Sequence, residues 1–334
     1  MDDSRNSVGR RRLLAALSTA AAGAFAGCPG SVGVTDSADE TGPTPAPIPT
    51  TATDAALPPD LAAVPCPRFP GATVDGQRRC GPFGPDDGIA LRTAERRPRL
   101  PAAALRFRFR NAGDAPLAGL SPPWSLQKYV DGRWHVLWPA QIRSGTDSAA
   151  AGGRERRTWE LAIDNGATDR LDPRRDLDVT LTGDATRIPV AGLGGGRYAF
   201  VVAGWLGGIA SERPVAVGAR FLLDGPALDL PLTDDVERAV RNGATTLVES
   251  DPGLGERVTY VLEPATPGAD APTLLAEQAI RNPPLRNLLS AYSPGAAQVR
   301  LRTRRHPAFP PLPERAFSFR GAGFGVSVAG DEDE

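Results

Sequence analysis

The residues of this chain best suited to chemistry are few: two histidines and three cysteines among 334 residues. They are His135, His306, Cys28, Cys66 and Cys80. A blue-copper centre needs two histidines close to a free cysteine, but these histidines lie in different halves of the sequence. The cysteine spacing matches neither a redox CxxC motif nor a Cys₂His₂ zinc site. We therefore expect no catalytic and no metal-binding residue in this set, and a structural role for His135.

Other short motifs that carry chemistry do not occur, or are better explained as turns. The sequence contains no Gly-x-Ser-x-Gly elbow, HExxH motif or EF-hand loop. The carboxylate pairs at 86–87 and 234–235 lie in loop-like sequence, where solvated turns or a weak calcium site are the alternatives. The glycine-rich segment 192–196 precedes an apolar run, whereas a dinucleotide-binding loop opens a helix, and Arg197 stands where its third glycine belongs. We expect a turn into a central strand, and no cofactor.

The first 28 residues predict an export signal. Three arginines, at 10–12, precede an uncharged run over residues 13–27. At about 1.5 Å per residue this run is ~22 Å long as a helix, too short for a permanent span of a ~30 Å bilayer core. The alternative is an uncleaved helix with an incidental cysteine.

Two short motifs in this segment resemble known signals. Arg10 and Arg11, followed by leucines, resemble a twin-arginine signal, which a receptor reads. The sequence FAGC, residues 25–28, resembles a lipobox, in which a diacylglyceryl group joins the cysteine thiol. The resemblance implies cleavage before Cys28 and a lipid anchor that holds the protein at the extracytoplasmic face of the cell membrane.

The next segment, residues 29–64, is rich in Pro, Thr and Ala and predicts a disordered stalk. Once Cys28 is lipidated, Cys66 and Cys80 remain as an even pair in an exported chain, which predicts a disulfide. Two free buried thiols are the alternative. In the chain-entropy model, closing a loop of about 15 residues contributes ~3 kcal/mol.

The clearest strand signal is the alternation over residues 105–110. Leu105, Phe107 and Phe109 point to one face and three arginines to the other, so one face is core and the other is solvent. Further strands are expected at 158–163, 176–181, 197–205, 219–223, 256–263, 299–305 and 317–320.

Two hairpins are predicted from turn residues. Asp131 and Gly132 supply the two positive φ angles of a type I′ turn, which pairs Tyr129 with Trp134. Both faces of that hairpin are partly apolar, so either can pack on the core. A second hairpin is expected around the AsnGly pair at 242–243.

Two short helices are expected in the C-terminal half. Asp270 is placed to cap a helix over residues 273–280, with Pro272 in its first turn. Asn282 is placed to cap a second helix, with Pro283 at its first position.

Three motifs resemble those of Ig-like β-sandwich domains of exported prokaryotic proteins. They are a Lys-x-x-Asp-Gly-x-Trp hairpin, a GlyGly turn before a tryptophan strand, and a Gly-Arg-Tyr strand: Lys128, Asp131, Gly132, Trp134; Gly152, Gly153, Trp159; Gly196, Arg197, Tyr198. The resemblance implies an Ig-like sandwich over residues 65–225 and includes no catalytic residue. We also expect a tyrosine-corner hydrogen bond from Tyr198 to the preceding turn. A smaller α+β domain or extension follows over residues 226–330.

The charge balance argues against nucleic acid as a partner. The formal net charge is −1, and removing residues 1–27, with their four arginines and two aspartates, leaves −3. The last four residues, 331–334, are all acidic and predict a solubilising tail, so the rest is nearly neutral. Lys128 is the only lysine among many arginines. With the signal, this composition resembles twin-arginine-exported lipoproteins of haloarchaea, a resemblance that implies no particular activity.

Together these features favour an exported, lipid-anchored surface protein with a non-catalytic binding or structural module. Its expected partners are the membrane, through the anchor, and a surface protein or small ligand. One alternative is an enzyme of the hydrolase class with a dispersed active site. Another is a module like a proteinase inhibitor, for which an exposed inhibitory loop would be the distinguishing feature.

Overall fold

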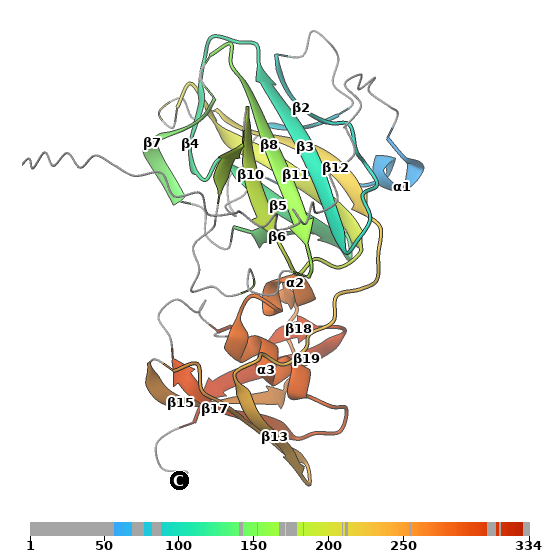
Figure 1. Ribbon diagram of the computed structural model, residues 1–334, viewed down its shortest axis with the longest axis vertical. Coiled ribbons are helices and arrows are strands. Elements are labelled where there is room, and N and C mark those ends of the chain that lie inside the picture. The colour runs from blue at the N-terminus through green and yellow to red at the C-terminus, as the bar shows by residue number, and fades with distance from the viewer. Residues whose placement is uncertain are drawn as a thin grey trace, which may run out of the picture. The chain divides into compact units, whose positions relative to one another are not determined.

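The computed structural model describes the chain in segments, and within them the protein is mainly β, as predicted (Figure 1). The strands form three sheets in these residues, and no helix there is both long and apolar enough to cross a membrane. The described residues are 57–68, 77–81, 88–139, 143–151, 153–166, 171, 179–182, 184–208, 210, 213–253, 255–305, 312–313 and 315–329.

The first sheet is built around one long strand, β11 (Gly196–Leu206). This strand pairs with β12 (Pro214–Leu223) on one side, and with β5 (Trp124–Val130) and then β4 (Leu117–Ser121) on the other. The glycine-rich segment before it is therefore a turn into a central strand, as expected. The remaining strands of this sheet are β1 (Gln77–Cys80), β6 (Arg133–Trp138) and β7 (Arg143–Ala151).

The second sheet has the strand order β2-β3-β8-β10-β9. Its pairs are antiparallel except β8 with β10, which run parallel. The expected strand over residues 176–181 begins only at Thr180, and residues 172–178 lie outside the described residues. The bounds are β2 (Ile89–Thr93), β3 (Ala102–Asn111), β8 (Arg156–Asp164), β9 (Thr180–Thr182) and β10 (Ala185–Val190).

The first two sheets share one apolar core, which makes this part sandwich-like. The alternation on β3 is confirmed: Leu105, Phe107 and Phe109 are at most 1% exposed. The ring of Phe107 stacks on that of Phe200 from β11, with centroids 4.4 Å apart. Trp159 of β8 also contacts the Phe200 ring, so aromatic side chains join the two sheets.

The hairpin β5–β6 forms as predicted, with Tyr129 opposite Trp134. Asp131 and Gly132 have φ angles of 48° and 78°, as a type I′ turn requires. Its two apolar faces are both used. One contributes Leu126 to the core between the sheets, and the other packs Tyr129 and Trp134 into a smaller cluster on the outer face of the first sheet.

A short segment that was predicted to be stalk covers this outer face. The prediction was wrong for residues 59–64: a short helix, α1 (Pro59–Ala62), places Leu61 and Val64 in buried positions. The composition of the Pro/Thr/Ala-rich segment does not mark these two side chains as different from its other apolar residues. Arg220 donates to the Val64 carbonyl, and the Trp134 indole N–H donates to that of Pro65 at 3.0 Å.

The same segment is tied down covalently. Cys66 and Cys80 are joined, with Cα atoms 5.7 Å apart, which confirms the predicted pairing and rules out two free thiols. The bond connects residues after α1 to the edge strand β1. Gln127, which is fully buried, adds a hydrogen bond from its side-chain amide to the Arg68 carbonyl at 2.8 Å.

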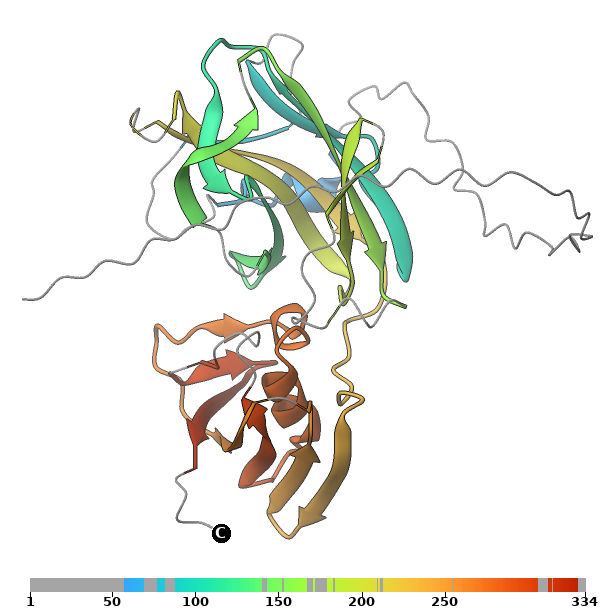
Figure 2. The same cartoon turned by 60° about the vertical axis from the view of Figure 1, so that its left-hand side comes forward.

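The third sheet lies in the C-terminal half and packs one face on α3 (Pro283–Ala291) (Figure 2). Asn282 caps α3 as predicted, accepting from the Leu285 N–H at 3.2 Å. Leu285 and Leu288 are buried against Leu301. The strands run in the order β13 (Val236–Asn242), β14 (Thr245–Ser250), β17 (Gln298–Arg305), β15 (Glu256–Pro264), β19 (Ala322–Val328), β18 (Phe317–Phe319), β16 (Thr273–Leu274).

The predicted helix over 273–280 is wrong in its first half. Thr273 and Leu274 instead form β16, which pairs in parallel with β18. The helix α2 (Ala276–Ala279) begins later, and Asp270 does not cap it. Leu275 is the N-cap, and the side chain of Gln278, three residues on, accepts from the Leu275 N–H at 3.0 Å, which is the second half of a capping box.

The predicted turn of the second hairpin also shifts by one residue. Asn242 pairs with Thr245, so the central turn residues are Gly243 and Ala244. Gly243 has a φ of 60°, and glycine at the first central position is what a type II′ turn requires.

Candidate functional site

Two of the most deeply buried charged side chains in the described residues, Glu277 and Arg281, are carried by α2 and the residues just after it. Glu277 is 2% exposed and Arg281 is 7% exposed. The helix is only four residues long, and it is held by packing at both ends. Leu275 enters the core of the first two sheets, and Ala279 enters the core of the third.

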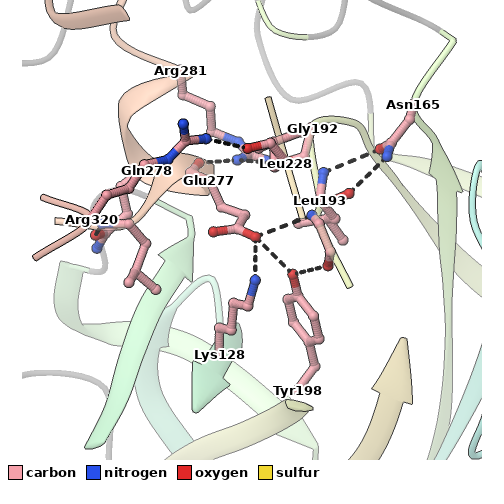
Figure 3. Close-up of polar contacts among 12 residues, drawn as sticks. Lys128, Asn165, Gly192, Leu193, Tyr198, Leu228, Glu277, Gln278, Arg281 and Arg320 are labelled. Atoms are coloured by element: carbon pink, nitrogen blue, oxygen red, sulfur yellow. Dashed lines mark hydrogen bonds and ion pairs between the residues drawn. The ribbon is translucent and has the colours of Figure 1, made fainter. Parts of the chain in front are cut away.

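The Glu277 carboxylate collects three donors from the first sheet and the loop before β11 (Figure 3). Its Oε1 atom lies 2.5 Å from Nζ of Lys128, 3.1 Å from the Gly194 nitrogen and 3.2 Å from the Tyr198 hydroxyl. The Lys128 and Glu277 side chains are 12% and 3% exposed, so solvent screens this ion pair little. The only lysine of the chain is therefore one half of a buried ion pair.

Tyr198 fixes the loop that faces Glu277. Its hydroxyl lies 2.6 Å from the Gly194 carbonyl oxygen, which confirms the predicted hydrogen bond to the preceding turn. Burial raises the pKa of Tyr198 well above its ordinary value, and the Glu277 charge adds to that effect. The phenol therefore stays protonated, and its single O–H proton is shared between the Gly194 carbonyl and, at the longer distance, Glu277 Oε1.

Arg281 holds the other side of the same loop. Its guanidinium donates to the carbonyls of Ala191 and Glu277, and its carbon lies 4.9 Å from the Trp138 ring centroid. Burial lowers the pKa of Arg281 to about 10, and the Glu277 charge opposes part of that decrease. The side chain remains charged at neutral pH.

Glycines let the loop before β11 lie close to the backbone of residues 225–228. A Cβ atom at Gly194 would lie 2.5 Å from the Leu228 nitrogen, and one at Gly195 would lie 2.1 Å from the Gly225 carbonyl oxygen. Both contacts are with backbone, which cannot move aside cheaply. The glycine run therefore serves this close packing.

Three further side chains hold the backbone segments around Glu277 in place. Asn165 binds both main-chain groups of Leu193, at 2.7 Å and 3.1 Å. Gln278 donates to the Val136 carbonyl at 3.0 Å, and Arg320 donates to that of Leu228 at 2.7 Å. We call the group Lys128, Gly194, Tyr198, Glu277 and Arg281 the buried latch.

The latch joins α2 to β5 and to the loop before β11. Its carboxylate oxygen, Oε1 of Glu277, is already surrounded by donors of the same chain. A general base needs an acceptor within reach of a substrate proton. Here Oε1 is enclosed by an ammonium, an amide and a phenol, all from the same chain. The arrangement suits holding β5, β11 and α2 together.

Of the residues singled out from the sequence, those that the structure describes do not lie together in one site. His135 is half-buried on β6, directly opposite Lys128 in the hairpin, and burial lowers its pKa. Asp235 accepts from Ser250 at 2.7 Å. Within the described segments, no group of three or more His, Cys, Asp and Glu side chains lies together as a metal would require.

The arginines near 154–157 make exposed ion pairs, as a surface turn would. Arg154 lies 2.6 Å from Asp114, and Arg157 lies 2.7 Å from Glu155. Several residues of the sequence predictions lie outside the described residues: Cys28, Arg10, Arg11, His306, Asp86, Asp87 and the acidic tail at 331–334.

Sequence reasoning missed Glu277 and Arg281, although one signal was present. Lys128 stands alone in a chain whose other basic side chains, histidines aside, are arginines, and a compact ammonium suits a single enclosed carboxylate. Nothing local marks its partner, because Glu277 is 149 residues away. No protein-family model matches the chain, and no curated protein matches its sequence.

Proposed function

We propose that the chain is an exported, lipid-anchored cell-surface protein whose β-rich part is a non-catalytic binding or structural module. The buried latch carries the proposal. Glu277 of α2 and Arg281 just after it bind Lys128 of β5 and the loop before β11, and such internal contacts are what a rigid binding or structural module needs.

The covalent link between Cys66 and Cys80 supports placement outside the cytoplasm. Structural disulfides persist in oxidising compartments and are rare in reducing ones. The resemblance of Arg10 and Arg11 to a twin-arginine signal supports export by that route. The resemblance of residues 25–28 to a lipobox supports a lipid anchor on Cys28. The membrane is thus one partner, and the second is a surface protein or small ligand. Nucleic acid is not among the partners.

We further propose that residues 65–225 form an Ig-like sandwich. Two sheets enclose one core, and Tyr198 bonds the carbonyl four residues before it, as in a tyrosine corner. The cysteine bond departs from the antibody pattern, since it ties a segment to the edge strand β1 and does not cross between the sheets.

Fractionation of cells that produce the full chain tests the proposal. The wild type should be recovered with membranes, and mass spectrometry should find a lipid on an N-terminal Cys28. Cys28→Ser should appear in the soluble extracytoplasmic fraction. The double variant Cys66→Ser/Cys80→Ser is the control, since it alters two cysteines and leaves the anchor. Cys28→Ser retained fully on membranes would refute lipid anchoring.

A further inference from the structure

The outer face of the second sheet carries a group of arginines on three neighbouring strands. Arg106 and Arg108 alternate along β3 with the buried residues of the core, so they point away from it. The strand register places Arg156 of β8 and Arg187 of β10 on the same side of the sheet. We call these four residues the cationic face. All but Arg106 are exposed, and the side chain of Arg106 is 41% exposed.

One carboxylate serves two of these four guanidinium groups. Glu160 Oε2 lies 3.1 Å from Nε of Arg106, and its Oε1 lies 3.8 Å from Nε of Arg187. Asp164, farther along β8, is the other acidic residue that the described strands place on this side, and it accepts from the Gly166 N–H. Glu160 therefore offsets one positive charge of the two beside it.

The other two arginines have no acidic partner among the residues that the structure describes. Arg108 is opposite Thr158, and Arg156 comes two residues before Thr158, so the two arginines are diagonal neighbours about 7–8 Å apart. Two guanidinium groups beside a hydroxyl offer several donors to the oxygens of one anionic group. Arg92 and Arg110 also lie on this face, but they have further contacts and are not counted.

A layer of phosphates fits this arrangement, because the arginines are spread over a sheet face and their side chains reach solvent. Guanidinium groups bind phosphate oxygens in a two-pronged geometry. Anionic lipid headgroups present such phosphates as a continuous surface, and each arginine near that surface strengthens the attraction about five-fold. We propose that the cationic face docks on the anionic phospholipid headgroups of the membrane that carries this protein.

This docking rests on the proposed lipid anchor, which holds the face near the membrane. About thirty residues separate Cys28 from α1. At ~3.3 Å per residue, a chain of that length spans at most ~100 Å. The helix α1 packs on the first sheet, and two packed sheets lie only about 10 Å apart, so this tether is long enough for the second sheet to reach the membrane. Tethering also raises the effective concentration, so weak contacts suffice.

Vesicle binding by the full chain carrying Cys28→Ser tests the docking, because this form has no thiol at position 28 to receive a lipid. One set of vesicles mixes anionic phosphatidylglycerol with phosphatidylcholine, and the other contains phosphatidylcholine alone. After centrifugation, the protein should sediment with the anionic vesicles and stay in solution with the neutral ones. Binding should weaken as salt rises, since exposed charges are screened.

Matched double variants of the same chain assign the binding to the cationic face. Arg108→Gln/Arg156→Gln should weaken binding to the anionic vesicles about 25-fold, because it removes two charges. Arg78→Gln/Arg238→Gln removes the same charge from exposed positions on β1 and β13 and should leave binding unchanged. Arg108→Lys/Arg156→Lys keeps both charges and should bind within about three-fold of the parent chain. Circular dichroism should show each variant folded.

Three results would overturn the docking. The first is equal sedimentation with the anionic and the neutral vesicles. The second is an equal loss of binding in the two glutamine variants. The third is Arg108- and Arg156-dependent binding of soluble polygalacturonate without binding to vesicles, which would assign the face to an acidic polymer. The proposed anchor is scored separately, on the chain that retains Cys28: recovery of that chain with membranes, without vesicle binding by the Cys28→Ser form, removes only the docking.

Discussion

Replacing Lys128 by Met tests whether the Lys128–Glu277 ion pair of the buried latch is shielded from solvent and stabilises the fold. Met keeps most of the length of the lysine side chain and removes the ammonium group. Glu277 then keeps the Gly194 N–H and the Tyr198 hydroxyl, at 3.1 Å and 3.2 Å, but loses its counter-charge.

The expected cost follows from burial. Removing one partner of a buried ion pair costs about 3–5 kcal/mol, since the other charge is left uncompensated. Two neutral donors remain on the Glu277 carboxylate, so we expect the lower end, ~3 kcal/mol. For a folded part of this size that lowers the melting temperature by roughly 6–12 °C.

An exposed pair of similar geometry is the control. Arg157 and Glu155 are 2.7 Å apart, but their side chains are 41% and 36% exposed. Exposed pairs contribute little, so Arg157→Gln should change the free energy of unfolding by about 0.5 kcal/mol or less. Urea denaturation of both variants at low and high salt gives the comparison, and the effect of Lys128→Met should persist in salt.

A double-mutant cycle completes the assay. Glu277→Gln keeps an acceptor oxygen and removes the charge, so Lys128→Met/Glu277→Gln should cost clearly less than the sum of the single variants. A coupling of about 1–3 kcal/mol is expected for groups in direct contact. Additive costs, or an effect of Lys128→Met no larger than that of Arg157→Gln, would refute the reasoning.

Three further predictions concern the aromatic core, Tyr198 of the latch and the disulfide. Phe107→Ala should cost ~3–5 kcal/mol by lost burial and a cavity, whereas Arg108→Gln should stay within about 0.5 kcal/mol; urea denaturation of both measures the contrast. The pKa of Tyr198 is raised in the folded state, so its contribution to stability is full below about pH 10 and is lost as pH rises further. Tyr198→Phe should flatten that alkaline decline in pH-dependent melting, and an unchanged decline would contradict the assignment. Digestion without reductant should yield one linked peptide containing Cys66 and Cys80, and reduction should lower stability by ~3 kcal/mol.

Local sequence signals predicted those elements whose partners are near in the chain. The alternation around Phe107 and the positive φ angles at Asp131 and Gly132 act within a few residues. Asn282 likewise caps α3 through a bond three residues on. In each case local conformation and tertiary packing favour the same structure, which is why the prediction held.

The errors arose where distant pairing decides. Thr273 and Leu274 begin a helical pattern in the sequence. They form a strand because they pair with β18, more than forty residues later, in the third sheet. Leu61 and Val64 stand in a Pro/Thr/Ala-rich segment, yet both are buried. The helix α1 contacts β12, and Val64 joins Trp134 of β6 in one cluster, and no local pattern connects the segment to either strand. The ion pair between Lys128 and Glu277 was not predicted for the same reason, since a lone lysine marks only one of the two partners.

The latch bears on whether residues 226–330 are an independent domain or an extension of the first two sheets. A four-residue helix has too few hydrogen bonds to form alone, so α2 depends on its tertiary contacts. Those contacts divide between two cores: Leu275 enters one and Ala279 the other. Without the first sheet, Leu275 would be exposed and Glu277 would lose all three of its donors. The physical dependence of α2 on both cores therefore favours an extension that folds onto the first two sheets over a domain that folds by itself.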